Sequence, residues 1–245
     1  MNAFRSILFN IFYMIGSLII SIFLLWALLL PPSLRVAVIS TVYGRFISLS
    51  ARYIMGLKLA VEGTEHLPKD GVYILAAKHQ SAFETLQIPF MPVFKYPAIV
   101  HKKELRYLPI WGLYLGGMGQ ISVDRGQGAE ALGSMALGCK RTFKMGRPVI
   151  IFPQGTRVAP GVKKPYKAGL AKLYRDLNVP IVPVALNSGV FWGRNAFFKK
   201  SGTITFKILP PLPPGMPPLK MMEQLEDMLE RESARLVKSA GEIAS

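Results

Sequence analysis

The first 55 residues are far more apolar than the rest of the chain. No charged side chain stands between Arg5 and Arg35, and the stretch 7–30 is almost wholly apolar before it meets Pro31-Pro32. As a helix, this stretch is about 36 Å long, against a bilayer hydrocarbon core of roughly 30 Å. It is too long for the apolar part of a cleaved signal peptide, and no small-residue cleavage site follows it. The pattern predicts a membrane-embedded N-terminal helix.

The next stretch, residues 33–55, interrupts apolar side chains with Arg35, Arg45 and Arg52. This spacing predicts an amphipathic helix that lies on a membrane surface or packs against the globular part of the chain. More cations follow the apolar run than precede it, where only Arg5 and the amino terminus stand. Because cation-rich flanks stay in the cytoplasm, we expect the globular part to face the cytoplasm.

From residue 57 onward, short apolar runs alternate with stretches of helical periodicity. The predicted strands are 57–63, 71–77, 97–101, 120–124, 147–152, 180–186 and 203–209, and the predicted helices are 83–93, 104–115, 128–145 and 167–177. Such alternation is typical of an α/β domain with a mainly parallel sheet flanked by helices. A Pro-rich segment, 210–218, then precedes a helix with an apolar stripe over 219–240. The predicted parts are therefore 1–55, 56–209 and 210–245.

Charge and cysteine content narrow the class of protein. The chain carries 30 Lys and Arg against 14 Asp and Glu, a formal net charge of +16, which attracts an anionic membrane surface or another polyanion. The basic residues are scattered and match no nucleic-acid-binding motif, so nucleic acid is disfavoured as a partner. One cysteine and three histidines exclude an intrachain disulfide and make a structural zinc site untenable. Neither phosphate-loop nor dinucleotide-binding glycine motifs are present.

Cations or a histidine follow four of the predicted strands. In a parallel sheet, ligands bind beyond the carboxyl ends of the strands, so these residues form one candidate site. Their chemistry suits a substrate that carries a phosphate. The residues are Lys78-His79, Lys102-Lys103, Arg125 and Gln154-Gly155-Thr156-Arg157.

His79 and Glu84 form a candidate base and its orienting carboxylate. In one continuous helix, side chains five residues apart diverge by about 140°, so the pair meets only if His79 precedes the helix. Ser81 and Glu84 fit a capping box, which places the helix start near Ser81. The same observation allows a plainer interpretation, in which Glu84 only caps the helix and His79 is an ordinary loop residue.

The segment 152–157 predicts the end of a strand followed by an anion-binding turn. After Pro153, Gly155 allows the backbone to approach a ligand, and Thr156 and Arg157 supply a hydroxyl and a guanidinium. The alternative is a plain loop with a surface arginine.

Together these segments resemble the glycerophospholipid acyltransferase family, typified by the 1-acyl-glycerol-3-phosphate acyltransferases, over about 57–209. The family motifs H-x-x-x-x-D, G-x-x-x-x-x-R, F-P-E-G-T-R and an apolar strand with a proline match 79–84, 119–125, 152–157 and 179–184, in order. A K-x-E-L-like element matches 102–105.

Two positions depart from the family pattern. Glu84 stands where the family has Asp; it keeps the charge and adds one methylene. Gln154 stands where the family has Glu; it keeps hydrogen-bonding capacity but cannot act as a base. Some bacterial relatives carry the same two changes, so they do not indicate an inactive enzyme.

The resemblance implies an enzyme of the bacterial cytoplasmic membrane that transfers an acyl chain to the sn-2 hydroxyl of lysophosphatidic acid. The donor would be acyl-CoA or acyl carrier protein, with no metal or bound cofactor. His79 would be the general base, Glu84 its orienting partner, and attack would be direct, since there is no G-x-S-x-G motif and Cys139 falls within a predicted helix. The implied substrate-binding residues are Arg125, Gln154, Gly155, Thr156, Arg157 and Lys103.

Two other functions stay open at this point. One is acylation of a different lysolipid, such as lyso-ornithine lipid, although a zwitterionic acceptor would need fewer cations at the strand ends. The other is a non-catalytic basic module that binds a membrane.

Overall fold

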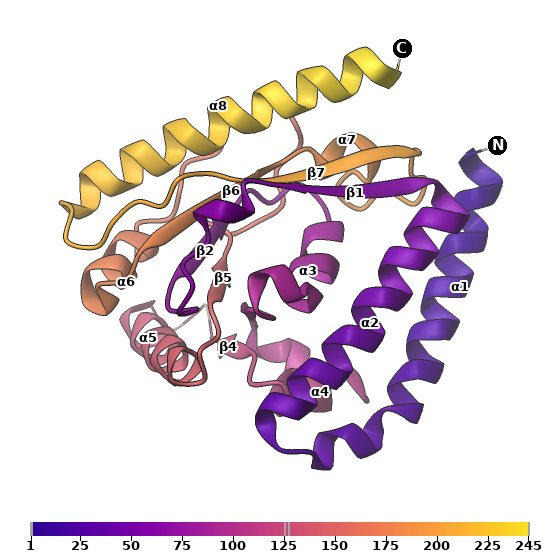
Figure 1. Ribbon diagram of the computed structural model, residues 1–245, viewed down its shortest axis with the longest axis horizontal. Coiled ribbons are helices and arrows are strands. Elements are labelled where there is room, and N and C mark those ends of the chain that lie inside the picture. The colour runs from indigo at the N-terminus through magenta and orange to yellow at the C-terminus, as the bar shows by residue number, and fades with distance from the viewer. Residues whose placement is uncertain (1, 125, 127, 245) are drawn as a thin grey trace.

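The computed structural model describes residues 2–124, 126 and 128–244, and its centre is a sheet covered by helices (Figure 1). Within the described part of the chain, seven strands form one sheet in the order β1-β7-β6-β2-β5-β3-β4. The strands are β1 (Leu57–Glu62), β2 (Ile74–Ala77), β3 (Ala98–Lys102), β4 (Ile121–Val123), β5 (Val149–Ile151), β6 (Ile181–Leu186) and β7 (Gly202–Ile208).

Most neighbouring strands are parallel, which confirms the predicted sheet. β2 pairs in parallel with β5 and β6, β5 with β3, and β3 with β4. β7 is antiparallel to β6, and β1 runs parallel to β7, so one edge pair is reversed. Because β2, β5, β3 and β4 are adjacent and parallel, their carboxyl ends open at the same edge of the sheet.

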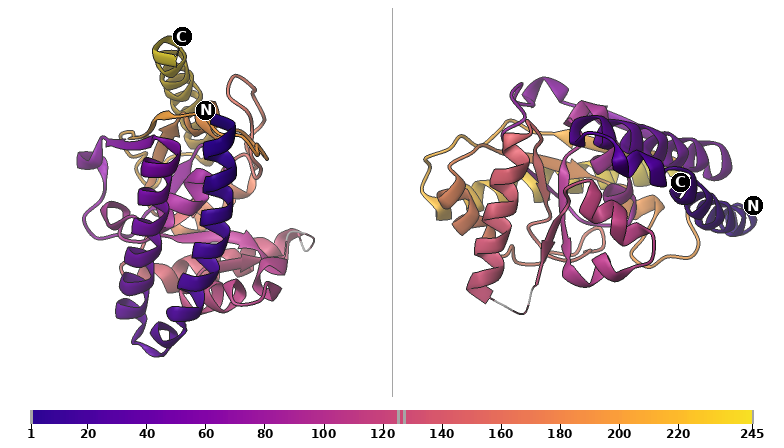
Figure 2. Two further views of the ribbon diagram at one scale, coloured as in Figure 1. Left: turned by 90° about the vertical axis from the view of Figure 1, so that its right-hand side faces the viewer. Right: turned by 90° about the horizontal axis from the view of Figure 1, so that it is seen from below.

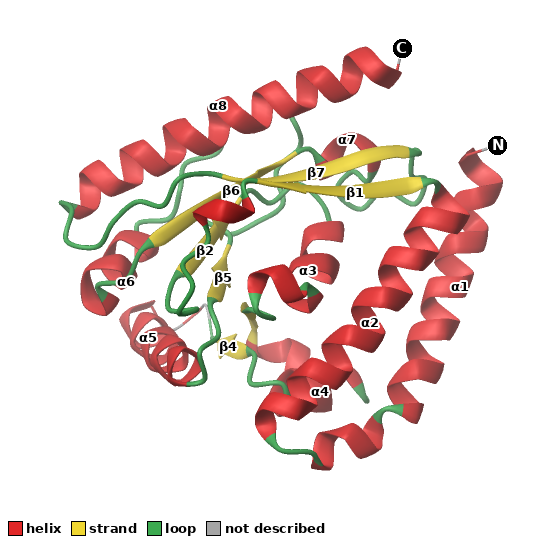
Figure 3. Ribbon diagram, viewed as in Figure 1, coloured by secondary structure: helices red, strands yellow, loops and turns green. Residues whose placement is uncertain are grey.

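The helices are distributed around this sheet as Figure 3 shows. They are α1 (Asn2–Phe23), α2 (Pro32–Met55), α3 (Phe83–Gln87), α4 (Trp111–Gly117), α5 (Gly128–Lys144), α6 (Gly169–Leu177), α7 (Ser188–Phe191) and α8 (Pro218–Ala244). The predicted helices 83–93 and 104–115 are wrong in length, because each is a short helix joined to 3-10 turns. Pro89, Pro92 and Pro109 interrupt them, and proline cannot continue the helical hydrogen-bond ladder.

The sheet is buried on both faces. Along β2, Leu75 and Ala77 pack in the cluster that contains residues of α2 and α3, whereas Ile74 and Ala76 pack in the cluster that contains residues of α6 and α8. Every residue of β6 is buried. This two-sided burial explains why the central strands read as continuous apolar runs rather than as alternating ones.

The N-terminal apolar stretch does not form a single helix. α1 ends at Phe23, a 3-10 turn covers Leu25–Leu29, and α2 returns beside α1 and also packs against α3 (Figure 1). The structure thus agrees with the interpretation of 33–55 as a helix packed on the protein. Both helices are long and apolar enough to cross a membrane by length and composition. The N-terminal end of α1 and the C-terminal end of α2 lie at the same end of this hairpin.

α1 turns its polar side chains inward. Ser6, Ser17 and Ser21 are buried, although a soluble helix of this length would turn them toward water. Its exposed large side chains are apolar: Phe4, Ile7, Leu8, Ile11, Phe12, Met14, Ile15, Leu18, Ile19, Ile22 and Phe23.

Candidate active site

His79 and Glu84 meet at the carboxyl end of β2. His79 lies in the turn between β2 and α3, and its Nδ1 is 2.9 Å from Oε1 of the fully buried Glu84. This is the arrangement that the five-residue spacing requires, because the histidine precedes the helix and the carboxylate reaches back to it.

Glu84 also forms its half of the predicted capping box, whereas the hydroxyl of Ser81 bonds one residue earlier than that motif requires. Glu84 Oε1 accepts hydrogen bonds from the backbone N–H groups of Gln80 (2.6 Å) and Ser81 (2.7 Å), while Ser81 Oγ accepts one from the N–H of Phe83 (2.9 Å). Ser188 Oγ donates to Oε2 at 2.7 Å. One carboxylate therefore caps the helix and orients the imidazole, so the two interpretations of Glu84 are compatible.

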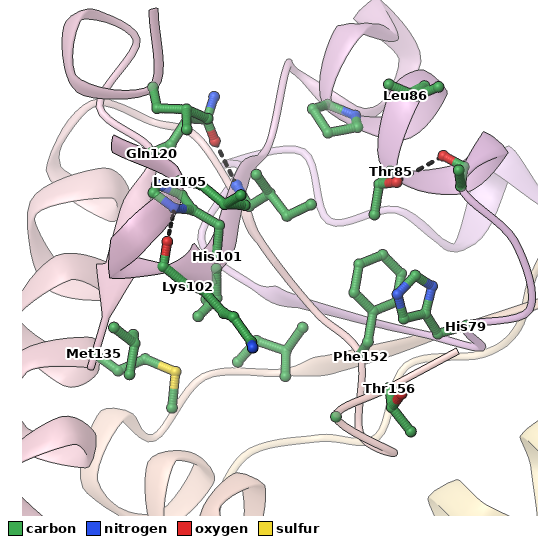
Figure 4. Close-up of a pocket in the computed structure, with 18 of the residues that line it drawn as sticks. His79, Thr85, Leu86, His101, Lys102, Leu105, Gln120, Met135, Phe152 and Thr156 are labelled. Atoms are coloured by element: carbon green, nitrogen blue, oxygen red, sulfur yellow. Dashed lines mark hydrogen bonds between the residues drawn. The ribbon is translucent and has the colours of Figure 1, made fainter. Parts of the chain in front are cut away.

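The imidazole of His79 is fixed in tautomer and in plane. Oε1 of Glu84 accepts from two backbone N–H groups, so the Nδ1 that faces it is a donor, and in the neutral imidazole this tautomer leaves the lone pair on Nε2. The ring stacks on Phe152, with 4.0 Å between centroids and 18° between planes (Figure 4). Phe152 belongs to the second candidate segment, so the two segments meet at the imidazole.

Backbone hydrogen bonds join the segment 152–157 to its surroundings. The N–H of Val158 donates to His79 O at 2.8 Å, and the N–H of Lys167 donates to Pro153 O at 2.8 Å. Gly155 has a φ of +68° and its N–H donates to Phe152 O, so this tight turn favours glycine.

A cavity of about 960 Å³ opens beside His79. It reaches from the α1–α2 hairpin at one end to α5 and α6 at the other, and its wall is mainly apolar. Residues that line it include Tyr13, Ser17, Ile39, Tyr43 and Ile47 from the hairpin and Leu132, Met135, Leu170 and Leu173 from α5 and α6. Among the described residues, no group of three or more His, Cys, Asp or Glu side chains is placed to hold a metal ion.

Comparisons with known proteins agree with these motifs. A family model described as Acyltransferase matches residues 58–187. The 1-acyl-sn-glycerol-3-phosphate acyltransferase of Pseudomonas aeruginosa is 32% identical over 213 residues, which cover 85% of this chain and 80% of that protein. The chain belongs to the acyltransferase family.

Similarity to other acyltransferases extends across kingdoms and to a solved structure. The human 1-acyl-sn-glycerol-3-phosphate acyltransferase alpha is 29% identical over 171 residues, covering 69% of this chain and 60% of that protein. The crystal structure of the 1-acyl-sn-glycerophosphate (LPA) acyltransferase of Thermotoga maritima superposes with a TM-score of 0.77 at 23% identity, covering 96% of this chain and 98% of that one. That likeness shows that the two chains share a fold over nearly their whole length.

The predicted cation positions differ in their relation to the acyltransferase cavity. Gly155, Thr156 and Arg157 line it. Lys103 is not among its lining residues; its side chain is 52% exposed and its Nζ lies 3.9 Å from Asp124 Oδ2. Lys102 lines the cavity instead (Figure 4). The assignment of Arg125 falls outside the described residues.

Gln154 is buried beneath the turn. It is 1% exposed, and within the described part of the chain neither its amide oxygen nor its amide nitrogen has a hydrogen-bond partner. It is also not among the residues that line the cavity. Its role in substrate binding stays a prediction from the motif.

Two residues of the site, Ser188 and His101, match no motif in the sequence. Ser188 supports Glu84 from α7. Phe152 belongs to a matched motif, but its stacking on His79 could not be predicted from that motif. His101 lines the cavity and is buried, with Nδ1 2.8 Å from Lys102 O and Nε2 3.2 Å from Ser122 Oγ. Burial lowers the pKa of His101. Both ring nitrogens therefore have partners that suit the neutral imidazole.

Proposed function

We propose that this acyltransferase transfers an acyl chain from a thioester to the sn-2 hydroxyl of lysophosphatidic acid and so forms phosphatidic acid. The observation that carries the proposal is the His79–Glu84 pair, which opens onto an apolar cavity with cations in its wall. Similar proteins from Pseudomonas aeruginosa, the plant Limnanthes douglasii and human are all named 1-acyl-sn-glycerol-3-phosphate acyltransferases.

In the proposed reaction, Nε2 of His79 takes the proton of the acceptor hydroxyl as its oxygen attacks the thioester carbonyl. The new C–O bond forms, the C–S bond breaks, and the proton passes from the imidazolium to the departing thiolate. Glu84 stabilises the imidazolium during this interval, because its Oε1 stays 2.9 Å from Nδ1. The acyl donor would be acyl-CoA or acyl carrier protein, and the chemistry needs no bound cofactor.

The acceptor phosphate would bind between the turn after β5 and the end of β3. Arg157 and Thr156 line the cavity on the first side and Lys102 on the second, which supports a charged headgroup between them. Arg125 is retained as a candidate from its motif alone. Lys103 becomes a weaker candidate than Lys102, because its ammonium group faces Asp124.

The acceptor would enter from a membrane. α1 buries its serines and exposes apolar side chains, which suits a lipid environment, and the cavity is partly lined by α1 and α2. We place the catalytic domain on the cytoplasmic side of the bacterial inner membrane. Arg5, in the first turn of α1, and Arg52, in the last turn of α2, support this orientation, since both stand at the end of the hairpin that joins the catalytic domain; Arg35 stands at the opposite end.

The deciding experiment is acyl transfer by the purified protein in detergent, with lysophosphatidic acid and either acyl-CoA or acyl carrier protein. We expect phosphatidic acid from the native protein and a loss of about 100-fold or more in His79→Ala. His66→Ala is the matched control, because the Nδ1 of His66 contacts Ile208 O, away from the cavity. Product that survives His79→Ala would move the base elsewhere, and no product with either donor would remove lysophosphatidic acid as the acceptor.

A further inference from the structure

The loop between α7 and β7 presents two aromatic side chains to the surroundings. Phe197 and Phe198 are 56% and 60% exposed, and their rings pack edge to face with 5.2 Å between centroids. Arg194 and Lys200 flank them in sequence. An exposed aromatic pair with cations on both sides is the composition of a segment that meets the boundary between lipid headgroups and acyl chains.

Hydrogen bonds connect this loop to the N-terminal half of α1, which lies beside it (Figure 2). Asn10 Nδ2 donates to Phe197 O at 3.2 Å, and the backbone N–H of Lys199 donates to Ser6 Oγ at 2.9 Å. Lys199 Nζ donates to Asn10 Oδ1 at 2.7 Å. Ser6 and Asn10 of α1 therefore have a specific partner, which is the backbone and lysine of this loop.

The buried side chain of Lys199 holds the loop and α1 together. It is 3% exposed, and its Nζ lies 4.6 Å from the ring centroid of Trp192 and 5.5 Å from that of Phe9. The two aromatic faces and the hydrogen bonds offset the cost of burying the ammonium group. Since Phe9 belongs to α1 and Trp192 follows α7, we expect the loop and α1 to move as one rigid unit.

The aromatic pair continues the apolar surface of α1. Ile7, Leu8 and Ile11 are exposed on the same part of α1 that holds the loop through Ser6 and Asn10. A lipid bilayer is the occupant that fits this surface, because α1 has the polarity of a lipid-facing helix and the loop adds cations for anionic headgroups.

We propose that the Phe197–Phe198 loop inserts into the membrane interface beside α1 and forms a second membrane contact of the enzyme. From Asn10 to Phe23, α1 advances about 20 Å, so the turn of the hairpin would lie that much farther along the helix axis from the loop. Arg194 Nη1 donates to Arg157 O at 3.3 Å. Insertion of the loop would therefore hold Arg157 near the headgroups; this last consequence rests on the proposed function, whereas insertion itself does not.

The first test measures lipid exposure of the loop in the full chain. A spin label is attached to Phe198→Cys, and the protein is reconstituted into vesicles of phosphatidylcholine and phosphatidylglycerol. The native Cys139 is buried, and burial raises its thiol pKa to about 12, so we expect the reagent to label only the introduced cysteine. The control is Leu219→Cys, which is 77% exposed at the start of α8, across the molecule from α1.

We expect the label at position 198 to collide more often with oxygen than with a water-soluble nickel complex, and the label at 219 to show the reverse. Equal water accessibility at the two positions would overturn the proposal. Spin–spin broadening at 198 that persists in detergent and disappears on dilution with unlabelled protein would assign the surface to a second copy of the chain and would also overturn it.

A second test uses activity. In the Phe197→Ser, Phe198→Ser double variant, we expect acyl transfer to a lysolipid embedded in vesicles to fall several-fold, with transfer in detergent micelles unchanged. An equal fall with both substrates would mean that the loop supports the fold and would count against the proposal. If the native protein formed no product in micelles, the proposed function would fail. The spin-label experiment would still test loop insertion, because it does not depend on activity.

Discussion

At the scale of single residues, the site depends on one buried carboxylate with several partners. Glu84 accepts hydrogen bonds from two backbone N–H groups and from Ser188, and it faces His79. The longer side chain, compared with the family's usual aspartate, reaches the imidazole with no loss of the helix cap. This explains physically how the position tolerates the substitution.

Glu84→Gln tests this shared role. The amide keeps the shape of the side chain, but it replaces one accepting oxygen with a donor, so either His79 or Ser188 loses its proper partner. We expect kcat to fall on the order of 100-fold or more, because the imidazole loses its tautomer control and its counter-charge. Ser188→Ala removes only one donor and should cost much less. Comparable losses in the two variants would contradict the orienting role of Glu84.

His101 gives a prediction about acid stability. Burial lowers its pKa, so the unfolded chain binds a proton at higher pH than the folded protein does. The stability due to the neutral ring is therefore present above the unfolded value of about 6.5 and declines as pH falls below it. We expect His101→Gln to show a shallower decline of the unfolding temperature between pH 7 and pH 5 than the native protein. An identical slope in thermal unfolding would refute this assignment.

The sequence predicted some of these contacts and could not predict others. The capping box placed His79 before the helix, so its meeting with Glu84 followed from local spacing. The choice between Lys102 and Lys103 depends on which side of the strand end each faces, and a shift of one residue in register reverses it. Ser188 is 104 residues from Glu84. No local pattern encodes a contact of that range.

At the scale of elements, α8 contacts residues next to both parts of the site, the His79 segment and the anion-binding turn. Lys78, which immediately precedes His79, is 3% exposed and forms an ion pair with Glu230 of α8. Tyr166 Oη donates to the same Glu230 oxygen at 3.0 Å, and the next residue, Lys167, is bonded to Pro153 of the anion-binding turn. The predicted helix 219–240 thus belongs to the architecture of the site, although its sequence shows only an apolar stripe.

We expect Glu230→Gln to destabilise the protein by roughly 3 kcal/mol or more, because it leaves the buried ammonium of Lys78 without its counter-charge. Asp227→Asn is the matched control on the same helix, since its pair with Arg231 is exposed and should be worth less than about 1 kcal/mol. Denaturant unfolding in detergent measures the difference. Equal shifts in the two variants would show that the Lys78–Glu230 pair does not stabilise the fold.

At the scale of the whole molecule, the strand order was less predictable than the strands. All seven predicted strands are present, but nothing in the alternating pattern marks β1 and β7 as reversed, because their direction is set by how the chain returns after α7. The α1–α2 hairpin could not be predicted from the sequence for a similar reason. Hydropathy reports the length of the apolar stretch, whereas the turn at 24–31 is visible only through the packing of α2 on α1. The hairpin brings the N-terminal end of α1 to the side of the catalytic domain, where a single crossing would have placed it opposite.

The exposed apolar surface of α1 gives a prediction about membrane attachment. Ile15 and Ile19 are 55% and 47% exposed on its outer side, and a lysine in the hydrocarbon core costs roughly 2.5–3.5 kcal/mol. We expect the Ile15→Lys, Ile19→Lys double variant to leave the membrane pellet after an alkaline carbonate wash, while the native protein and the control Leu137→Lys, on α5, stay in the pellet. Its unfolding temperature in detergent should change little, since neither side chain packs in the interior. If the double variant remained in the pellet, a protein surface rather than lipid would have to cover this side of α1, and the hairpin would be an internal support of the acyltransferase cavity instead of its anchor.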